Sequence, residues 1–336
     1  MMTDTLYLSG RDLAGLAEPE EFVEVTREGF SYRGEGAPAM APARIRGEET
    51  TTTTYTVEFD EWGIKGGYMY SVGDDVWYTT PLFDSETGEI LAILDGAVWN
   101  PYKTAAVGAV ATDYLSRDDA ESVGVVGSGG IAKATIELIN VVRDISSIEV
   151  FSPTPSSREE FADEVEDYLN VDTKAVSSSD AAVSDSDIII VATSASGPVI
   201  NGDAVAEGTH INAMGAAHPK REIDVATFEK VSKYVPDIRE RVFGNSVQTR
   251  FRGARGFLEA YDQGVVSEAT LHAELGQIAA GSITGRTSAD EVTLADSVGT
   301  AIETVAVAFM LYEKAKERDL GKSIEFIPRH ESSALR

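Results

Sequence analysis

Residues 121–139 of this chain read ESVGVVGSGGIAKATIELI, and this stretch decides the fold that we expect. Its apolar residues 122–126 predict a buried strand, and the residues that follow Gly129 predict a helix. Gly127, Gly129 and Ala132 have the spacing G-x-G-x-x-A. The first glycine makes a tight turn, the second lets the backbone approach a pyrophosphate, and the small third residue lets helix and strand pack closely. Since amides at a helix start can hold diphosphate charge, the stretch predicts a dinucleotide-binding Rossmann domain.

Strand and helix patterns alternate along the chain from residue 113 onward. The predicted elements are strands at 122–126, 147–151, 187–192, 210–214 and 231–235, and helices at 130–142 and 156–169. Strands separated by helices imply βαβ units and a parallel sheet. We therefore predict an α/β fold in which residues 113–299 form the Rossmann domain.

The first hundred residues lack this alternation and predict an α+β domain instead. A helix is expected at 18–30, followed by antiparallel strands at 51–59, 62–70, 76–83 and 89–94, with a hairpin turn at 85–88. An alanine-rich helix is expected at 105–115. A last helix at 298–318 suits packing on this first domain, and the polar residues after it are expected to fray. We predict that residues 1–112 and 300–336 together form this domain.

Composition narrows the class of protein. The chain has 336 residues, no cysteine and a formal net charge of −28, from 56 acidic and 28 basic residues. Such a charge repels nucleic-acid phosphate, and its self-repulsion is relieved where salt screens it. We expect a protein of a halophile's cytoplasm, with an acidic mesophilic enzyme as the alternative. No signal sequence, long apolar run or helical His/Glu metal-ligand pair is found, so neither a membrane segment nor a metal site is predicted.

The end of the second Rossmann strand bears on the choice of dinucleotide. An acid there bonds the ribose hydroxyls of NAD and repels the 2′-phosphate of NADP. This chain has FSPTPSSR at residues 151–158, in which hydroxyls and Arg158 replace the acid. NADP(H) is therefore favoured and NAD(H) stays open, as does the alternative that Ser156 and Ser157 only cap the next helix.

Further cofactor contacts are expected where the other strands end, although residues 192–196 could also form an ordinary turn and Ser297 could cap the last helix. The residues predicted to bind the cofactor are Gly127, Ser128, Gly129, Gly130, Ile131, Ser152, Thr154, Ser157, Arg158, Ala192, Thr193, Ser194, Met214, Gly215, Ser297 and Gly299.

Seven segments, in order along the chain, resemble the ornithine cyclodeaminase/μ-crystallin family. They are GIKGG (63–67), LFDSETGEILAILDG (82–96), TAAVGAVATDYLSR (104–117), VGVVGSGGIA (123–132), VFSPTPSSREEFA (150–162), GTHINAMGA (208–216) and ITGRTSADEVTLADSVG (283–299). The resemblance implies an NAD(P)-dependent oxidoreductase that moves a hydride between nicotinamide and the Cα of a small amino or imino acid. An imine or ketimine reductase or an alanine dehydrogenase would do so. It also implies a homodimer formed through the sheet of the first domain.

The same resemblance suggests which residues hold the substrate carboxylate. The positions that match the family pattern are Arg44 or Arg46, Lys65 and Lys103, and Lys65 is also expected to take part in catalysis. At the third position lysine stands where the family has arginine. The charge is kept, but the bidentate fork that grips a carboxylate is lost.

The family's catalytic aspartate corresponds to Ala217 here, which counts against an ornithine cyclodeaminase, an ammonia-releasing lyase. His218 next to it is predicted to move a proton near neutral pH, the alternative being a surface loop residue. A third possibility is a μ-crystallin-like protein that binds the cofactor with weak catalysis. The reductase or dehydrogenase explains the most residues.

Overall fold

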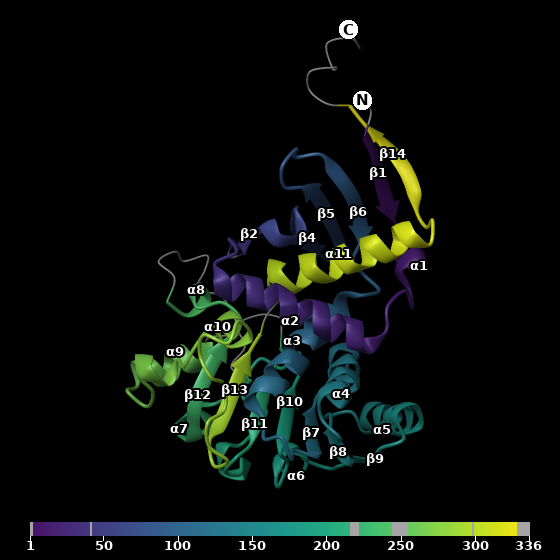
Figure 1. Cartoon of the computed structure of the whole chain (residues 1–336). Coiled ribbons are helices and arrows are strands. Elements are labelled where there is room, and N and C mark those ends of the chain that lie inside the picture. Colours follow the sequence, from purple (N-terminus) through teal and green to yellow (C-terminus); the bar gives the residue numbers. More distant parts are fainter. Residues whose placement is uncertain (1–2, 41, 216–221, 244–254, 298, 328–336) are drawn as a thin grey trace.

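Two seven-stranded sheets with a layer of helices between them make up the computed structural model of this chain (Figure 1). The structure describes residues 3–40, 42–215, 222–243, 255–297 and 299–327. Within these residues no helix is long and apolar enough to cross a membrane. The α/β class with a Rossmann sheet is confirmed.

The second sheet is fully parallel and has the strand order β12-β13-β11-β10-β7-β8-β9. Its strands are β7 (Ser122–Val126), β8 (Ser147–Phe151), β9 (Asp172–Ala175), β10 (Ile188–Val191), β11 (His210–Ala213), β12 (Val231–Pro236) and β13 (Val292–Asp296). The chain runs outward from β7 to β9 and then returns to place β10 beside β7 on the other side. Ligands bind at such a switch point, outside the carboxyl ends of the strands.

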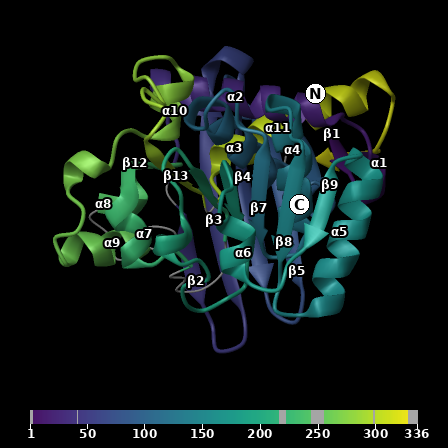
Figure 2. The same ribbon diagram turned by 90° about the horizontal axis from the view of Figure 1, so that it is seen from below.

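Helices cover both faces of this parallel sheet, and its central strand β10 is accordingly apolar throughout. The helices are α3 (Asn100–Leu115), α4 (Gly130–Val142), α5 (Pro155–Leu169), α6 (Ser179–Val183), α7 (Val225–Lys230), α8 (Glu240–Phe243), α9 (Arg255–Asp262) and α10 (Leu275–Ala279). All four residues of β10 are fully buried. Figure 2 shows β7, β8 and β9 side by side, with α5 at their flank.

The first sheet has the order β14-β1-β6-β5-β4-β3-β2. Its strands are β1 (Thr3–Leu8), β2 (Ala43–Arg46), β3 (Thr51–Phe59), β4 (Ile64–Val72), β5 (Val76–Asp84), β6 (Ile90–Asp95) and β14 (Lys322–Phe326). The helices α1 (Gly10–Leu13), α2 (Pro19–Glu35) and α11 (Ala301–Glu317) complete this part. A Cβ built on Gly66 of β4 would lie 2.9 Å from Val305, so α11 packs directly on this sheet.

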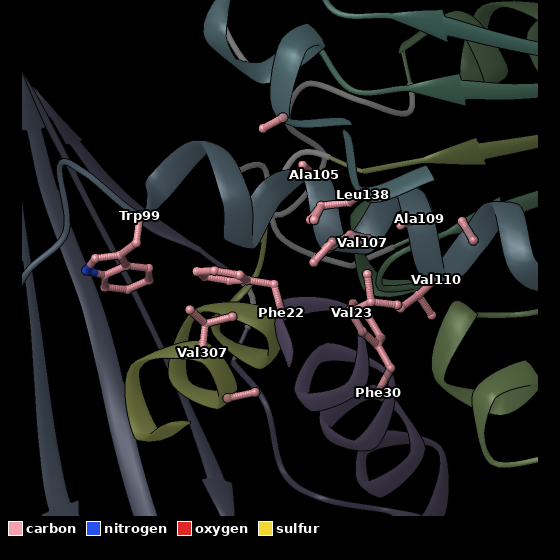
Figure 3. Close-up of a cluster of buried hydrophobic side chains, with 14 of the residues drawn as sticks. Phe22, Val23, Phe30, Trp99, Ala105, Val107, Ala109, Val110, Leu138 and Val307 are labelled. Atoms are coloured by element: carbon pink, nitrogen blue, oxygen red, sulfur yellow. The ribbon is translucent and has the colours of Figure 1, made fainter. Parts of the chain in front are cut away.

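The helical layer joins the two sheets through one apolar core. Figure 3 shows Val107 and Val110 of α3 between Leu138 of α4 and the α2 side chains Val23 and Phe30. The helix α3 contacts α2 and α11 on one side and α4, β11 and β13 on the other, so it lies between the two predicted domains. The domain boundaries at residues 112 and 300 stay a prediction.

Several predicted elements are confirmed with their bounds, among them β3, β7, α4 and β8. The prediction that residues after the last helix only fray is wrong for Lys322–Phe326, which form β14 and pair with β1. The first sheet is also not purely antiparallel, since β1 runs parallel to β6. The strand β14 is mostly exposed and has only two apolar residues, Ile324 and Phe326, so its distant partner reveals it better than its own sequence. The predicted helix at 298–318 begins at Ala301, because Thr300 is its N-cap.

Candidate functional site

A groove of about 1000 Å³ follows the carboxyl ends of β7, β8 and β10. Eleven of the residues predicted to bind the cofactor line it: Gly127, Ser128, Gly129, Gly130, Ile131, Ser152, Thr154, Ser157, Ala192, Thr193 and Ser194. The groove lies at the switch point between β7 and β10, where a parallel sheet of this kind binds a dinucleotide.

The glycines at the start of α4 have the properties that a diphosphate site needs. Gly127 has φ +114°, and a Cβ there would lie 2.3 Å from the carbonyl oxygen of Ala192, so the turn admits only glycine. A Cβ on Gly129 or Gly130 would have no atom within 4 Å, which leaves the backbone open to a ligand. The first amides of α4 have no partner within the helix. These residues therefore fit the pyrophosphate of a dinucleotide.

Hydroxyl groups and one arginine surround the end of β8. Arg158 donates from Nη1 to the carbonyl oxygen of Ser152 (2.9 Å), and its guanidinium lies 5.9 Å from the ring centroid of Phe151. The N-cap of α5 is Thr154, so Ser156 and Ser157 lie inside the helix and do not cap it. Arg158 itself is not among the residues that line the groove, whereas Glu160 is.

Four predicted cofactor residues lie at the ends of β11 and β13 and do not line the groove: Met214, Gly215, Ser297 and Gly299. Met214 is buried and its amide donates to the carbonyl oxygen of Val191 (2.8 Å). The hydroxyl of Ser297 lies 3.3 Å from Asp237 Oδ2, and the amide of Gly299 lies 3.4 Å from Ser297 Oγ. These loops extend the same sheet edge toward the first domain.

Glu222 is a buried acid at this edge that the sequence analysis missed. Its Oε1 accepts hydrogen bonds from the amide (3.0 Å) and the hydroxyl of Thr193. A Cβ built on Gly215 would lie 1.5 Å from Glu222 Oε2, so that glycine leaves room for the carboxylate. Glu222 thereby fixes the loop after β10, and no local pattern in the sequence distinguishes it from a surface acid.

Arg44 and Lys103 lie at opposite sides of a cluster of tyrosines on the α11 side of the first sheet. The cluster consists of Tyr55, Tyr68, Tyr70 and Tyr78, with ring centroids 5.4–6.4 Å apart. Arg44 donates to Thr53 Oγ1 (2.8 Å) and Tyr70 Oη (3.4 Å), and its Nη1 is buried without a hydrogen-bond partner. Arg46, the alternative to Arg44, is exposed.

Lys103 is 3% exposed and lies in the first turn of α3. Its Nζ is 3.5 Å from Glu303 Oε1 and 4.9 Å from the ring centroid of Tyr68. Burial raises the pKa of Glu303, although Lys103 and the hydrogen bonds from Thr300 act in the opposite direction. A Cβ on Gly299 would lie 3.2 Å from Lys103 Nζ, so this lysine reaches the end of β13 at the edge of the Rossmann sheet.

Lys65 lies on the other face of the first sheet. Gly66 packs against α11, and successive side chains of a strand point to opposite faces. Accordingly, Lys65 Nζ donates to the carbonyl oxygen of Ser85 (3.2 Å) and lies 4.0 Å from Glu58 Oε1. The structure thus brings Arg44 and Lys103 to one tyrosine cluster and keeps Lys65 apart from it. Ala217 and His218 lie outside the described residues.

Comparisons with known proteins agree with this architecture. The model of the ornithine cyclodeaminase/mu-crystallin family matches residues 18–319. A Δ1-pyrroline-2-carboxylate reductase of Bacillus cereus is 34% identical over 246 residues, which are 73% of each chain.

Two solved structures are similar over almost the whole chain. The Thermococcus litoralis Δ1-pyrroline-2-carboxylate reductase in complex with NADH and L-proline is 31% identical, with a TM-score of 0.87 over 95% of this chain and 100% of that one. An archaeal alanine dehydrogenase dimer with bound NAD is 28% identical, with a TM-score of 0.88 over 97% of this chain and 100% of the other.

Proposed function

We propose that this chain, which belongs to the ornithine cyclodeaminase/mu-crystallin family, is an NAD(P)H-dependent reductase of a small imino acid. The observation that carries the proposal is the position of Lys103. This buried cation extends from the first domain to Gly299, at the sheet edge where the dinucleotide groove lies. A substrate carboxylate held there would stand at the edge from which a nicotinamide can react.

Arg44 and Lys103 are the residues that we assign to the substrate carboxylate. The unpartnered Nη1 of Arg44 is a buried donor, and such a group costs free energy until an acceptor meets it. Lys103 stands at the start of α3, where the helix dipole also favours an anion. The tyrosine rings between them offer apolar faces to a small side chain or ring.

The reaction adds two groups to the C=N bond of the imino acid. A hydride adds to the carbon, which becomes Cα, and a proton adds to the nitrogen, so that an amino acid is formed. A bound nicotinamide dinucleotide supplies the hydride. The chain's own residues orient the carboxylate and exclude water, and His218 is our proposal for the proton donor. A role for Lys65 in this chemistry stays a prediction without a supporting contact.

The proposed substrates are cyclic imino acids like those of the relatives, with the imine of pyruvate and ammonia as the second class. An ornithine cyclodeaminase is the less favoured candidate, since Ala217 offers no carboxylate at the family's aspartate position. A cofactor-binding protein with weak catalysis is the third candidate, and binding of NAD(P)H without turnover of any imino acid would favour it.

We further propose that NADP(H) is the preferred cofactor. Ser152, Thr154 and Ser157 present hydroxyls at the end of β8, and Arg158 bonds to Ser152 beside them. These groups suit a 2′-phosphate, whereas the nearby Glu160 opposes one. The solved relative with NADH keeps NAD(H) as the competing cofactor.

A homodimer formed through the first sheet is also part of the proposal. The sheet face opposite α11 has a groove of about 940 Å³, lined by Met40, Met69, Pro81 and Ile93 among others. Trp77, on the same strand as Pro81, is 75% exposed. A second copy would cover this apolar face, as large exposed patches in monomers are rare. The excess of acidic residues supports a salty cytoplasm as the setting.

The substitution Lys103→Met tests the assignment. A hydrogen bond to a charged group contributes roughly 1.5–3 kcal/mol, so kcat/KM for the imino acid should fall roughly ten- to a hundredfold. The affinity for NAD(P)H, measured by fluorescence in high salt, should stay within about threefold. If kcat/KM is unchanged, the carboxylate is held elsewhere.

A further inference from the structure

Glu303 is a fully buried acid that the proposed reaction does not use (0% exposed). Its Oε1 lies 3.5 Å from Lys103 Nζ, and its carboxylate also accepts from the amide and the hydroxyl of Thr300. Burying a charge is costly unless it is paired and hydrogen-bonded. The arrangement satisfies that requirement and places an acid directly behind the proposed carboxylate-binding lysine.

The position of this carboxylate is fixed by the helix that carries it. Thr300 is the N-cap of α11, and Glu303 completes a capping box with it. The acid is therefore held at both carboxyl oxygens by hydrogen bonds from Thr300 that do not involve Lys103. Its carboxyl group has a fixed position in the first turn of α11, next to Lys103 in the first turn of α3.

Lys103, in contrast, has a side chain whose direction depends on its neighbours. Lysine has a flexible stem and three donor protons without a fixed geometry. Glu303 Oε1 accepts a hydrogen bond from the ammonium (3.5 Å), and the centroid of the Tyr68 ring lies 4.9 Å from Nζ. Gly299 packs against both members of the pair, because a Cβ there would lie 3.2 Å from Lys103 Nζ and 3.4 Å from Glu303 Oε1.

The other groups that face this pair are acids and phenols. Asp237, which follows β12, adds to the effect of burial in raising the pKa of Glu303, and Lys103 opposes both. Tyr55 Oη lies 3.8 Å from the Cβ position of Gly299, and burial raises the pKa of Tyr68. Among the described residues, the cation that forms an ion pair with Glu303 is Lys103.

We propose that Glu303 is a positioning residue, whose capped carboxylate directs the ammonium of Lys103 toward the substrate carboxylate. The proposal rests on the proposed function, since Lys103 has to bind the substrate. Without Glu303 the flexible lysine would lose the acceptor that sets the direction of its ammonium. The acid would then act on substrate binding, and hardly on the hydride step.

The test compares Glu303→Gln with Glu303→Asp in steady-state kinetics with a cyclic imino acid and NAD(P)H. Glutamine has the same shape and can still pair with Thr300, so the cap is kept while the charge is lost. We expect KM to rise about tenfold with kcat within about threefold. Aspartate keeps the charge and should bring KM back toward the wild-type value.

Glu313→Gln is the matched control, because Glu313 is a half-exposed acid of the same helix that pairs with Lys316 at 3.0 Å. It should leave KM unchanged. If Glu303→Gln lowers the melting temperature but leaves KM unchanged, Glu303 only caps α11 and the proposal is wrong. If the wild-type protein itself reduces no imino acid, the proposed function fails first, and this role fails with it.

Discussion

Gly127 and Gly129 provide a matched test of the dinucleotide groove, because alanine at the first should lower stability and alanine at the second should lower only cofactor affinity. At Gly127 a Cβ would lie 2.3 Å from the carbonyl oxygen of Ala192, about 1 Å inside the ordinary contact distance of 3.4 Å. The backbone there also has φ +114°. Strain of this kind costs roughly 1–3 kcal/mol, which corresponds to a drop of roughly 2–12 °C in the melting temperature.

At Gly129 the same methyl group would meet no protein atom within 4 Å, and φ is −88°. Gly129→Ala should therefore keep the free energy of unfolding within about 0.5 kcal/mol. The methyl group would instead occupy the space of the pyrophosphate, so the dissociation constant of NAD(P)H should rise at least about tenfold.

The assay is a fluorescence titration of NAD(P)H in high salt, beside thermal unfolding without cofactor. Gly127→Ala should lose both stability and affinity, and Gly129→Ala affinity alone. If Gly129→Ala binds NAD(P)H as the wild type does, the open space over α4 is not the diphosphate site.

His210, Arg158 and the net charge of the chain each allow a further test. His210 is fully buried and burial lowers its pKa to about 3, from 6.5 unfolded. Since the unfolded chain alone takes up the proton, stability should fall by about 1 kcal/mol between pH 6.5 and 5.5, and His210→Gln should remove that part of the slope in denaturant titrations. Arg158→Ala should weaken NADPH about tenfold and NADH less than threefold, as measured by their dissociation constants; equal losses would contradict the proposed NADP(H) preference. With a net charge of −28, the protein should melt at a higher temperature in molar potassium chloride than in dilute buffer, and a salt-independent melting curve would remove the argument for a halophile.

Features that depend on local residues were predictable from the sequence. The turn at Gly127 needs a backbone conformation that only glycine adopts freely, and the strand and helix beside it have strong apolar patterns. The groove residues of β7, β8 and β10 follow from this one motif. The family resemblance then supplied Arg44 and Lys103.

What the sequence left open depends on contacts between distant residues. The pairing of β14 with β1 joins the two ends of the described chain, and this short exposed strand has only two apolar residues, Ile324 and Phe326. Glu222 and Glu303 look like surface acids, because nothing near them in sequence shows that each is buried against a remote partner. The side of the sheet on which Lys65 lies depends on which residues of β4 face α11, and the packing of Gly66 against Val305 decides this.

Imino-acid reduction by this protein is tested most directly by the stoichiometry of turnover with a cyclic imino acid such as Δ1-pyrroline-2-carboxylate. Purified protein in high salt would be mixed with NAD(P)H and the imino acid, and the cofactor oxidised and the amino acid formed would be counted together. An imino-acid reductase should form one amino acid for each NAD(P)H oxidised. Release of ammonia from ornithine without net oxidation of cofactor, or no turnover of any imino acid, would contradict it.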